Sequence, residues 1–320
     1  MTDPKTILVT GCAGFIGGNF VNQFKGRFPG TKIIGIDNFS TGRTGVIKSE
    51  VTLYKGSVLD EALVKRVFTE QAPEYVFHFA ALPNVSHANE HPRLTTEVNV
   101  VGTVALLEAS KEAGVKRFIY SSSSSIYGGA NKLPTKESEN PPNPKSPYAI
   151  QKYTGEPFCK SFSDLFGLDT VSLRYFNAFG PGQYGNSAYS SVIPAWLESL
   201  YSPSDKRAFM EGDGSQTRDF CYVDNIVSAN ILAMEAPGPL KGDVFNIAHG
   251  GRTSLEEVRT LIEKYTARKL DLEKRPSRLG DIKHSYADIS KANQILDYSP
   301  IVSFEDGLKR TIEWFESKTK

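Results

Sequence analysis

The sequence of 320 residues has little cysteine, almost no net charge and no long apolar run. Its 3 cysteines are too few and too far apart for a disulfide framework or a cysteine-based zinc site. A formal net charge of +1 predicts no basic surface of the kind that binds nucleic acid or an anionic membrane. Because no stretch of roughly 18 apolar residues occurs, no membrane span is predicted.

The remaining composition is typical of a soluble globular protein, with 39% hydrophobic and 23% charged residues. The length fits about two domains, or one large α/β domain with an appendage. No apolar signal segment follows the first residues, so we expect a cytoplasmic location.

A dinucleotide-binding pattern occupies the N-terminal segment. A buried strand is predicted over Thr6–Thr10, and the glycine-rich turn Gly11-Cys12-Ala13-Gly14-Phe15-Ile16-Gly17 leads from it into residues with helical periodicity. Glycines allow a tight turn close to a pyrophosphate, and a helix N-terminus supplies N–H groups to the phosphates. The next strand, Lys32–Ile36, ends in Asp37, whose carboxylate can accept hydrogen bonds from the adenosine ribose. These features predict NAD, and Arg43 nearby keeps NADP as an alternative. A plain strand-to-helix turn is the other interpretation of the glycines.

Strands and helices then alternate along the chain. We predict strands at Val51–Lys55, Tyr75–Phe79, Arg117–Ser121 and Thr170–Tyr175, and helices at Glu61–Glu70, Leu94–Ala113 and Pro147–Phe166. This order predicts an α/β fold with a Rossmann-type doubly wound parallel sheet and ligands at the C-terminal strand ends. The sequence becomes irregular after Asn177, apart from a strand expected at Asp243–Ile247 and an amphipathic helix near Phe304–Phe315. We therefore predict an NAD-binding domain over residues 1–178, which also takes back 221–250. A smaller C-terminal α/β substrate domain is predicted over 179–320.

The segment from Ser146 to Lys152 carries the predicted chemistry. Ser146 suits a helix N-cap and Pro147 the first helical position, so Tyr148 and Lys152 would stand one turn apart on one face. A free Tyr has a pKa of about 10, which a nearby ammonium and a bound cationic cofactor would lower. The serine run Ser121–Ser125, at the end of a predicted strand, could place a hydroxyl beside Tyr148. A Tyr-x-x-x-Lys spacing also arises by chance, so its meaning depends on the structural context.

Other chemistry is less well supported. The segment from His87 to His91 matches an inverted zinc-protease motif, but Pro83 and Pro92 bracket it, so we expect a solvated loop and no metal site. A serine nucleophile would need a Gly-x-Ser-x-Gly elbow, which the sequence lacks. A non-catalytic redox sensor or nucleic-acid-binding protein on the same fold remains an alternative. Such a protein would be expected to lose the Tyr or Lys, or to gain a basic face.

Taken together, the motifs resemble the extended short-chain dehydrogenase/reductase family over essentially the whole chain. They are the segments Thr10–Gly17, Asp37–Gly42, Ser121–Gly128, Tyr148–Lys152 and Arg174–Asn177. Within this family the chain is similar to nucleotide-sugar epimerases, and most of all to bacterial UDP-N-acetylglucosamine 4-epimerases, through residues 188–194, 212–214, 218–225 and 278–281. Related dehydratases and decarboxylases carry an acid before the Tyr-Gly of the serine turn. This chain has hydroxyls there, which protonate a leaving group poorly, so those reactions are not expected.

The resemblance implies a reversible oxidation at C4 of a UDP-sugar. Tyr148 would take the O4 proton while C4 gives a hydride to NAD, Lys152 would hold the phenolate and the cofactor ribose, and Ser123 would bond O4. The cofactor contacts that it implies are Gly11, Gly14, Phe15, Ile16, Gly17, Asp37, Asn38, Ser40, Thr41, Gly42, Ser57, Val58, Phe79, Ala80, Ala81, Asn99, Ser121, Tyr148, Lys152 and Tyr175. The substrate contacts that it implies are Ser123, Ser124, Tyr148, Asn177, Gln183, Ser191, Val192, Phe209, Arg218, Arg278, Asp281 and Ser285.

Ser285 bears on the choice of substrate. Family members limited to glucose and galactose have a bulky Tyr at this position, so a serine leaves room for a 2-acetamido group. The resemblance therefore implies UDP-N-acetylglucosamine and UDP-N-acetylgalactosamine as substrates. UDP-glucose is the first alternative and UDP-glucuronate the second, and the selectivity could instead lie at other residues.

The resemblance also implies a homodimer in which Leu94–Ala113 and Pro147–Phe166 form a four-helix bundle. Two residues depart from the family pattern. Ser57 replaces an Asp that reaches the adenine amine, which puts the affinity for NAD in doubt. His87 stands where the subgroup often has an Arg, which puts that loop's contact with the substrate in doubt.

Overall fold

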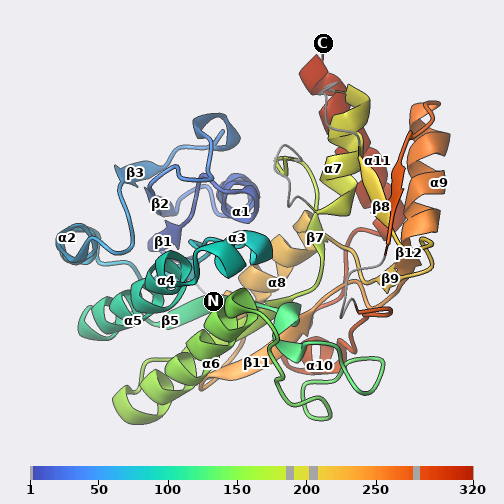
Figure 1. Ribbon diagram of the computed structural model, residues 1–320. Coiled ribbons are helices and arrows are strands. Elements are labelled where there is room, and N and C mark those ends of the chain that lie inside the picture. Colours follow the sequence, from blue (N-terminus) through green and yellow to red (C-terminus); the bar gives the residue numbers. More distant parts are fainter. Residues whose placement is uncertain (1–2, 185–190, 202–207, 277–281, 320) are drawn as a thin grey trace.

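The computed structural model describes residues 3–184, 191–201, 208–276 and 282–319 (Figure 1). Its central sheet is made of β1 (Thr6–Thr10), β2 (Lys32–Asp37), β3 (Thr52–Lys55), β4 (Tyr75–His78), β5 (Arg117–Ser123), β6 (Thr170–Tyr175) and β11 (Asp243–Ile247). The strand order is β11-β6-β5-β4-β1-β2-β3, and every neighbouring pair is parallel. The predicted Rossmann-type α/β fold is thus confirmed. The expected strand at residues 243–247 forms one edge of this sheet.

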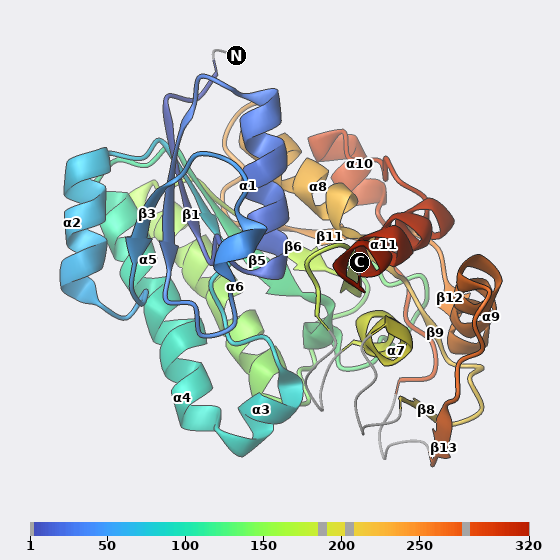
Figure 2. The same cartoon turned by 90° about the horizontal axis from the view of Figure 1, so that it is seen from above.

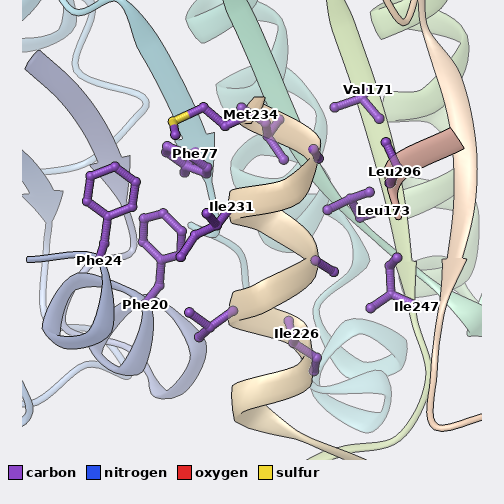
Figure 3. Packing of buried hydrophobic residues seen from close by; sticks show 14 of the residues in the cluster. Phe20, Phe24, Phe77, Val171, Leu173, Ile226, Ile231, Met234, Ile247 and Leu296 are labelled. Atoms are coloured by element: carbon purple, nitrogen blue, oxygen red, sulfur yellow. The ribbon is translucent and has the colours of Figure 1, made fainter. Parts of the chain in front are cut away.

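Helices cover both faces of the sheet, as Figure 2 shows from above. One face carries α1 (Phe15–Arg27), α8 (Val223–Glu235) and α10 (Ser290–Leu296), and the other carries α2 (Glu61–Gln71), α5 (Gly102–Glu112) and α6 (Pro147–Phe166). On the first face, the rings of Phe20 and Phe77 lie 4.3 Å apart, and Ile231 packs in the same cluster (Figure 3). Burial on both faces explains why the strands are nearly continuous apolar runs. We call the sheet and these helices the sheet region.

A second group of elements lies beside the sheet region and packs around Trp196. Its helices are α7 (Val192–Tyr201), α9 (Leu255–Thr266) and α11 (Phe304–Thr319), the last of which includes the predicted C-terminal helix. Its strands are short: β8 (Phe209–Glu211) pairs with β13 (Glu273–Arg275), β9 (Thr217–Arg218) with β12 (Thr253–Ser254), and β7 (Ala178–Phe179) with β10 (Cys221–Tyr222). We call this group the C-terminal lobe. The division into two domains stays a prediction.

Two segments differ from the sequence-based expectation. The helix predicted over Leu94–Ala113 is interrupted: α4 (Pro92–Thr96) passes through a π-helical turn (Glu97–Val101) into α5. The loop expected around His87 is instead the helix α3 (Val85–Glu90), because Asn84 Oδ1 accepts the His87 N–H at 2.8 Å and caps it. Pro92 does not break this helix, since it occupies the first position of α4.

Two further features concern the described residues alone. No group of three or more His, Cys, Asp or Glu side chains there could hold a metal ion. None of the helices in those same ranges is long and apolar enough to cross a membrane.

Candidate active site

The glycine turn between β1 and α1 has the shape of a phosphate cradle. Gly11 has a φ of +69°, and a Cβ on it would lie 2.7 Å from the Ala80 backbone nitrogen. A Cβ on Gly17 would collide with the carbonyl oxygen of Gly11. Only glycine therefore fits where the strand turns into α1, and the open N-terminus of that helix can receive a pyrophosphate. The residues present fit the dinucleotide that the sequence predicts.

Asp37 lies at the end of β2, where the adenosine ribose of such a cofactor would bind. Its Oδ2 accepts the Ala13 N–H and its Oδ1 the Phe39 N–H, both at 2.8 Å, which fixes the buried carboxylate beside the glycine turn. A carboxylate has about four acceptor positions, so two remain for ribose hydroxyls. Gly42 lies so close to the glycine turn that a Cβ added to it would be only 2.9 Å from the Ala13 Cβ. The loop between Asn38 and Gly42 therefore flanks this site.

Several of the remaining predicted cofactor residues lie at or near the same edge of the sheet, and hydrogen bonds or packing hold them in place. The Ser57 hydroxyl accepts the Leu59 N–H at 3.2 Å, and Val58 is buried against α5. Asn99, in the π-helical turn, holds the backbone of Leu82 through both its amide oxygen and its amide nitrogen. Phe79, Ala80 and Ala81 follow β4 at the same edge of the sheet. Asn99 thus positions the loop after β4 through the Leu82 backbone.

The helix α6 brings the predicted catalytic pair to the C-terminal end of β5. Ser146 caps it, as predicted, by accepting the Ala149 N–H at 3.2 Å, and Pro147 follows at the first position. Tyr148 and Lys152 consequently lie one turn apart. Lys152 is buried, and its Nζ donates to the Ser121 carbonyl at 2.8 Å.

Burial shifts the pKa values of both members of this pair. Burial raises the pKa of Tyr148 to about 12, while its side-chain hydrogen bond with Ser123 lowers the pKa by less. Burial also lowers the pKa of Lys152 to about 8. The sequence-based expectation is that the ammonium and a bound cationic cofactor together lower this pKa, and it stays a prediction. A further positive charge is required before Tyr148 can act as a base near neutral pH.

The serines of the run have different surroundings, because alternate residues of β5 face opposite sides. Ser121 Oγ lies 3.2 Å from the Tyr175 hydroxyl, and Ser123 bonds Tyr148. Ser122 instead donates to Glu156 at 2.6 Å on the buried side. The serine turn thus gives one hydroxyl to Tyr148 and anchors the neighbouring serines in the protein.

A buried ion pair that the sequence reasoning missed lies beneath this turn. Glu156, one turn beyond Lys152 on α6, binds Arg174 of β6 through both carboxylate oxygens, at 2.9 and 2.7 Å. The Arg174 guanidinium also donates to the Tyr127 hydroxyl at 2.7 Å, and Tyr127 donates to Asn246. The i,i+4 spacing of Glu156 from Lys152 was the available signal, since it places a second charge on the buried face.

A cavity opens next to Ser123 and is lined by Ser124, Tyr127, Phe176, His284 and Ser285 among others. Two of these, Ser124 and Ser285, are predicted substrate contacts from segments far apart in the sequence. His284 Nδ1 lies 2.9 Å from the Thr217 hydroxyl, so this imidazole is held at the cavity wall. The structure therefore brings the serine turn and the segment 282–287 to one small site.

The other predicted substrate residues that the structure describes are not part of the lining of this cavity. Asn177 donates to the Asp219 carbonyl at 3.0 Å, and Gln183 donates to Ala178 O at 3.1 Å. Ser191 and Val192 stand at the start of α7, Phe209 lies in β8 beneath the Arg275 guanidinium, and Arg218 lies in β9. The predicted contacts Arg278 and Asp281 lie outside the described residues.

The chain is similar to known proteins along almost its whole length. Residues 7–248 match the model of the NAD dependent epimerase/dehydratase family. The crystal structure of a UDP-glucose 4-epimerase from Thermotoga maritima superposes with a TM-score of 0.92 at 37% identity, covering 98% of this chain and 100% of that one.

Two further relatives carry other substrate names. A UDP-N-acetylglucosamine 4-epimerase from Methanobrevibacter ruminantium, solved in complex with UDP-N-acetylmuramic acid, gives a TM-score of 0.91 at 36% identity, covering 99% and 100% of the two chains. A UDP-glucuronate 4-epimerase from Thermodesulfobacterium geofontis is 32% identical over 96% of this chain and 95% of its own. Relatives with three different sugars are thus similarly close.

Proposed function

The chain belongs to the NAD dependent epimerase/dehydratase family, and from this premise we propose that it interconverts UDP-N-acetylglucosamine and UDP-N-acetylgalactosamine by epimerisation at C4. When bound, NAD supplies the hydride acceptor for C4 and the hydride donor for the resulting 4-keto sugar. The glycine cradle and Asp37 would hold this cofactor. The observation that carries the proposal is the position of Tyr148 one helical turn from buried Lys152, beside β5, the strand that ends in Ser123.

The proposed mechanism uses the side chains at the end of β5. Tyr148, as phenolate, accepts the proton of O4 while the C4–H bond breaks, and it returns the proton to O4 after the ketone has turned over. Ser123 holds O4 through its hydroxyl, and Lys152 stabilises the phenolate by its charge. Arg218 and Arg278 would hold the diphosphate, because a guanidinium binds phosphate oxygens in pairs, so that only the sugar turns.

Ser285 supports the acetamido substrate. It lines the cavity next to Ser124, where the ring of a tyrosine would take the space that an acetamido group needs. UDP-glucose is the first alternative, since a smaller sugar also fits. UDP-glucuronate is the second, and His284 favours it because an imidazole N–H at the cavity wall can bind a carboxylate.

The test is to incubate the purified holoprotein separately with UDP-N-acetylglucosamine, UDP-glucose and UDP-glucuronate and to identify the products by NMR. We expect UDP-N-acetylgalactosamine from the first. A Ser285→Tyr variant should lose roughly 10- to 100-fold in kcat/KM for UDP-N-acetylglucosamine and little for UDP-glucose, with Ser285→Ala as the matched control. Epimerisation of UDP-glucose alone, or an unaffected Ser285→Tyr variant, would rule out the substrate assignment.

We also propose a homodimer, formed when α5 and α6 of two copies make a four-helix bundle. Apolar side chains on and near these helices are exposed, including Val101 at 54%, Ile150 at 51% and Leu165 at 71%. A patch of this kind is typical of a protein interface. Sedimentation should give a dimer, and Ile150→Glu with Leu165→Glu should give a monomer, whereas a monomeric wild type would contradict the proposal. The cytoplasmic location stays a prediction.

A further inference from the structure

Arg43 and Tyr184 meet across the two parts of the molecule and have no role in the chemistry above. The Arg43 guanidinium lies 3.6 Å from the centroid of the Tyr184 ring. That ring meets Trp314 of α11 edge-on, with centroids 5.2 Å apart and an interplanar angle of 72°. The contact therefore joins the loop after β2 to the segment after β7 and anchors both on the C-terminal lobe.

Both sides of this contact are tied to the cofactor cradle by their backbones. The Arg43 N–H donates to the carbonyl of Ala13, within the glycine turn, at 2.9 Å. On the other side, Asn19 of α1 donates through Nδ2 to the Pro181 carbonyl at 2.8 Å. The glycine turn and the first turns of α1 are where the pyrophosphate binds. The Arg43–Tyr184 stack thus connects the two segments that contact that site.

Stacking leaves the binding capacity of the arginine intact. A guanidinium that stacks on an aromatic ring uses its face, so its N–H donors remain in the plane for a phosphate. The ring also restricts the rotamers of the long side chain, which lowers the entropy lost on binding. A positive charge fixed beside the cradle matches the negative charge of a dinucleotide pyrophosphate.

We propose that Arg43 and Tyr184 are further cofactor-binding residues, which form a clasp that slows the release of NAD. Arg43 binds the pyrophosphate and Tyr184 holds the guanidinium in place, so NAD leaves only when the stack opens. The use of such a clasp rests on the proposed function. An epimerase has to keep the reduced cofactor until the keto sugar has turned over.

The test measures release directly. Holoprotein loaded with radiolabelled NAD is chased with excess unlabelled NAD, and the label retained on the protein is followed with time. Release should be roughly 3- to 30-fold faster from Arg43→Ala and from Tyr184→Ala, because a cation–π contact of this strength is lost. Tyr184→Phe, which keeps the ring, should stay within about twofold of wild type.

The double variant separates a joint clasp from two independent effects. Because both residues act through one contact, Arg43→Ala with Tyr184→Ala should release NAD about as fast as the faster single variant. Unchanged release from Tyr184→Ala, or a double variant whose effect is the product of the two, would overturn the clasp. Since the readout needs no sugar turnover, it stands even if the proposed substrate is wrong. Arg43 is exposed, so its replacement leaves the core intact.

Discussion

Some buried polar side chains of the sheet region bind one another, whereas the buried carboxylate of Asp219 in the C-terminal lobe binds backbone. Glu156 pairs with Arg174, and Asn99 donates to Gln151 Oε1 at 2.8 Å. By contrast, the carboxylate of Asp219 accepts three backbone N–H groups, from His249, Gly250 and Ala287, at 2.9 to 3.1 Å.

The lengths of the strands explain this difference. Long parallel strands satisfy their own backbone groups through the ladder, which leaves side chains available to organise a site. The strands of the C-terminal lobe have only two or three residues, so its irregular segments need side chains to satisfy their backbone. Reactive groups are therefore expected at the sheet edge and adaptable binding segments in the lobe.

The largest effect is expected at Tyr148, the proposed catalytic base. Tyr148→Phe should lower kcat by about a thousandfold, because the variant lacks the group that takes the O4 proton. Tyr153→Phe, a replacement on the same helix, is the matched control and should keep activity. Bound NAD, measured by absorbance after release, should be unchanged in both variants. Turnover by Tyr148→Phe at the wild-type rate would remove Tyr148 from the mechanism.

Arg–Glu pairs in the two regions allow their contributions to the unfolding free energy to be compared. Arg174→Ala should cost about 3 to 5 kcal/mol of unfolding free energy, because it leaves Glu156 buried without its partner. Arg259→Ala, which breaks partly exposed pairs on α9, should cost less than about 1 kcal/mol. Urea unfolding measures both. Equal losses of unfolding free energy would mean that the buried pair stabilises the protein no more than the partly exposed pairs do.

The pH dependence of stability should report Lys152. Burial lowers its pKa to about 8 in the folded protein, so between pH 8 and its ordinary value near ~10.4 the unfolded chain binds more protons. Its contribution to stability therefore rises with pH across this window, and below it the buried charge is a cost. In NAD-free protein, the unfolding free energy of wild type relative to Lys152→Met should rise by roughly 3 kcal/mol. A difference in unfolding free energy that stays constant or falls with pH would mean that the Lys152 amine is exposed to water.

A smaller effect than that of Arg174→Ala is expected for Asp219, the backbone-binding acid of the lobe. Asp219→Asn keeps the shape but brings an NH₂ group towards N–H donors, which should cost about 1 to 3 kcal/mol of unfolding free energy. Because Asp219 joins segments beside the cavity, KM for the UDP-sugar should rise while NAD retention stays unchanged. Kinetics and the NAD chase distinguish these readouts. A loss of NAD with unchanged KM would assign Asp219 to the cofactor side.

Features set by neighbours in the chain could be predicted from the sequence. The cap at Ser146, the Tyr148–Lys152 spacing and the position of Asp37 follow from local patterns, and the structure has them at the strand ends. The contacts of Glu156, Gln151 and Asp219 could not be predicted, because their partners are 18, 52 and 68 residues away. The burial of Tyr148, which raises its pKa, could not be predicted for the same reason, since it depends on the whole fold.

The proposed mechanism depends on the acidity of Tyr148, because this phenol can act as a base only when the charge of the cofactor offsets its burial. Protein labelled with ¹³C at the tyrosine Cζ, with Tyr148 assigned by the Tyr148→Phe spectrum, can be titrated with and without NAD. Without NAD the Tyr148 signal should remain that of a phenol up to about pH 10, and with NAD it should ionise at clearly lower pH. A Tyr148 that stays un-ionised to the same pH with NAD bound would contradict the account.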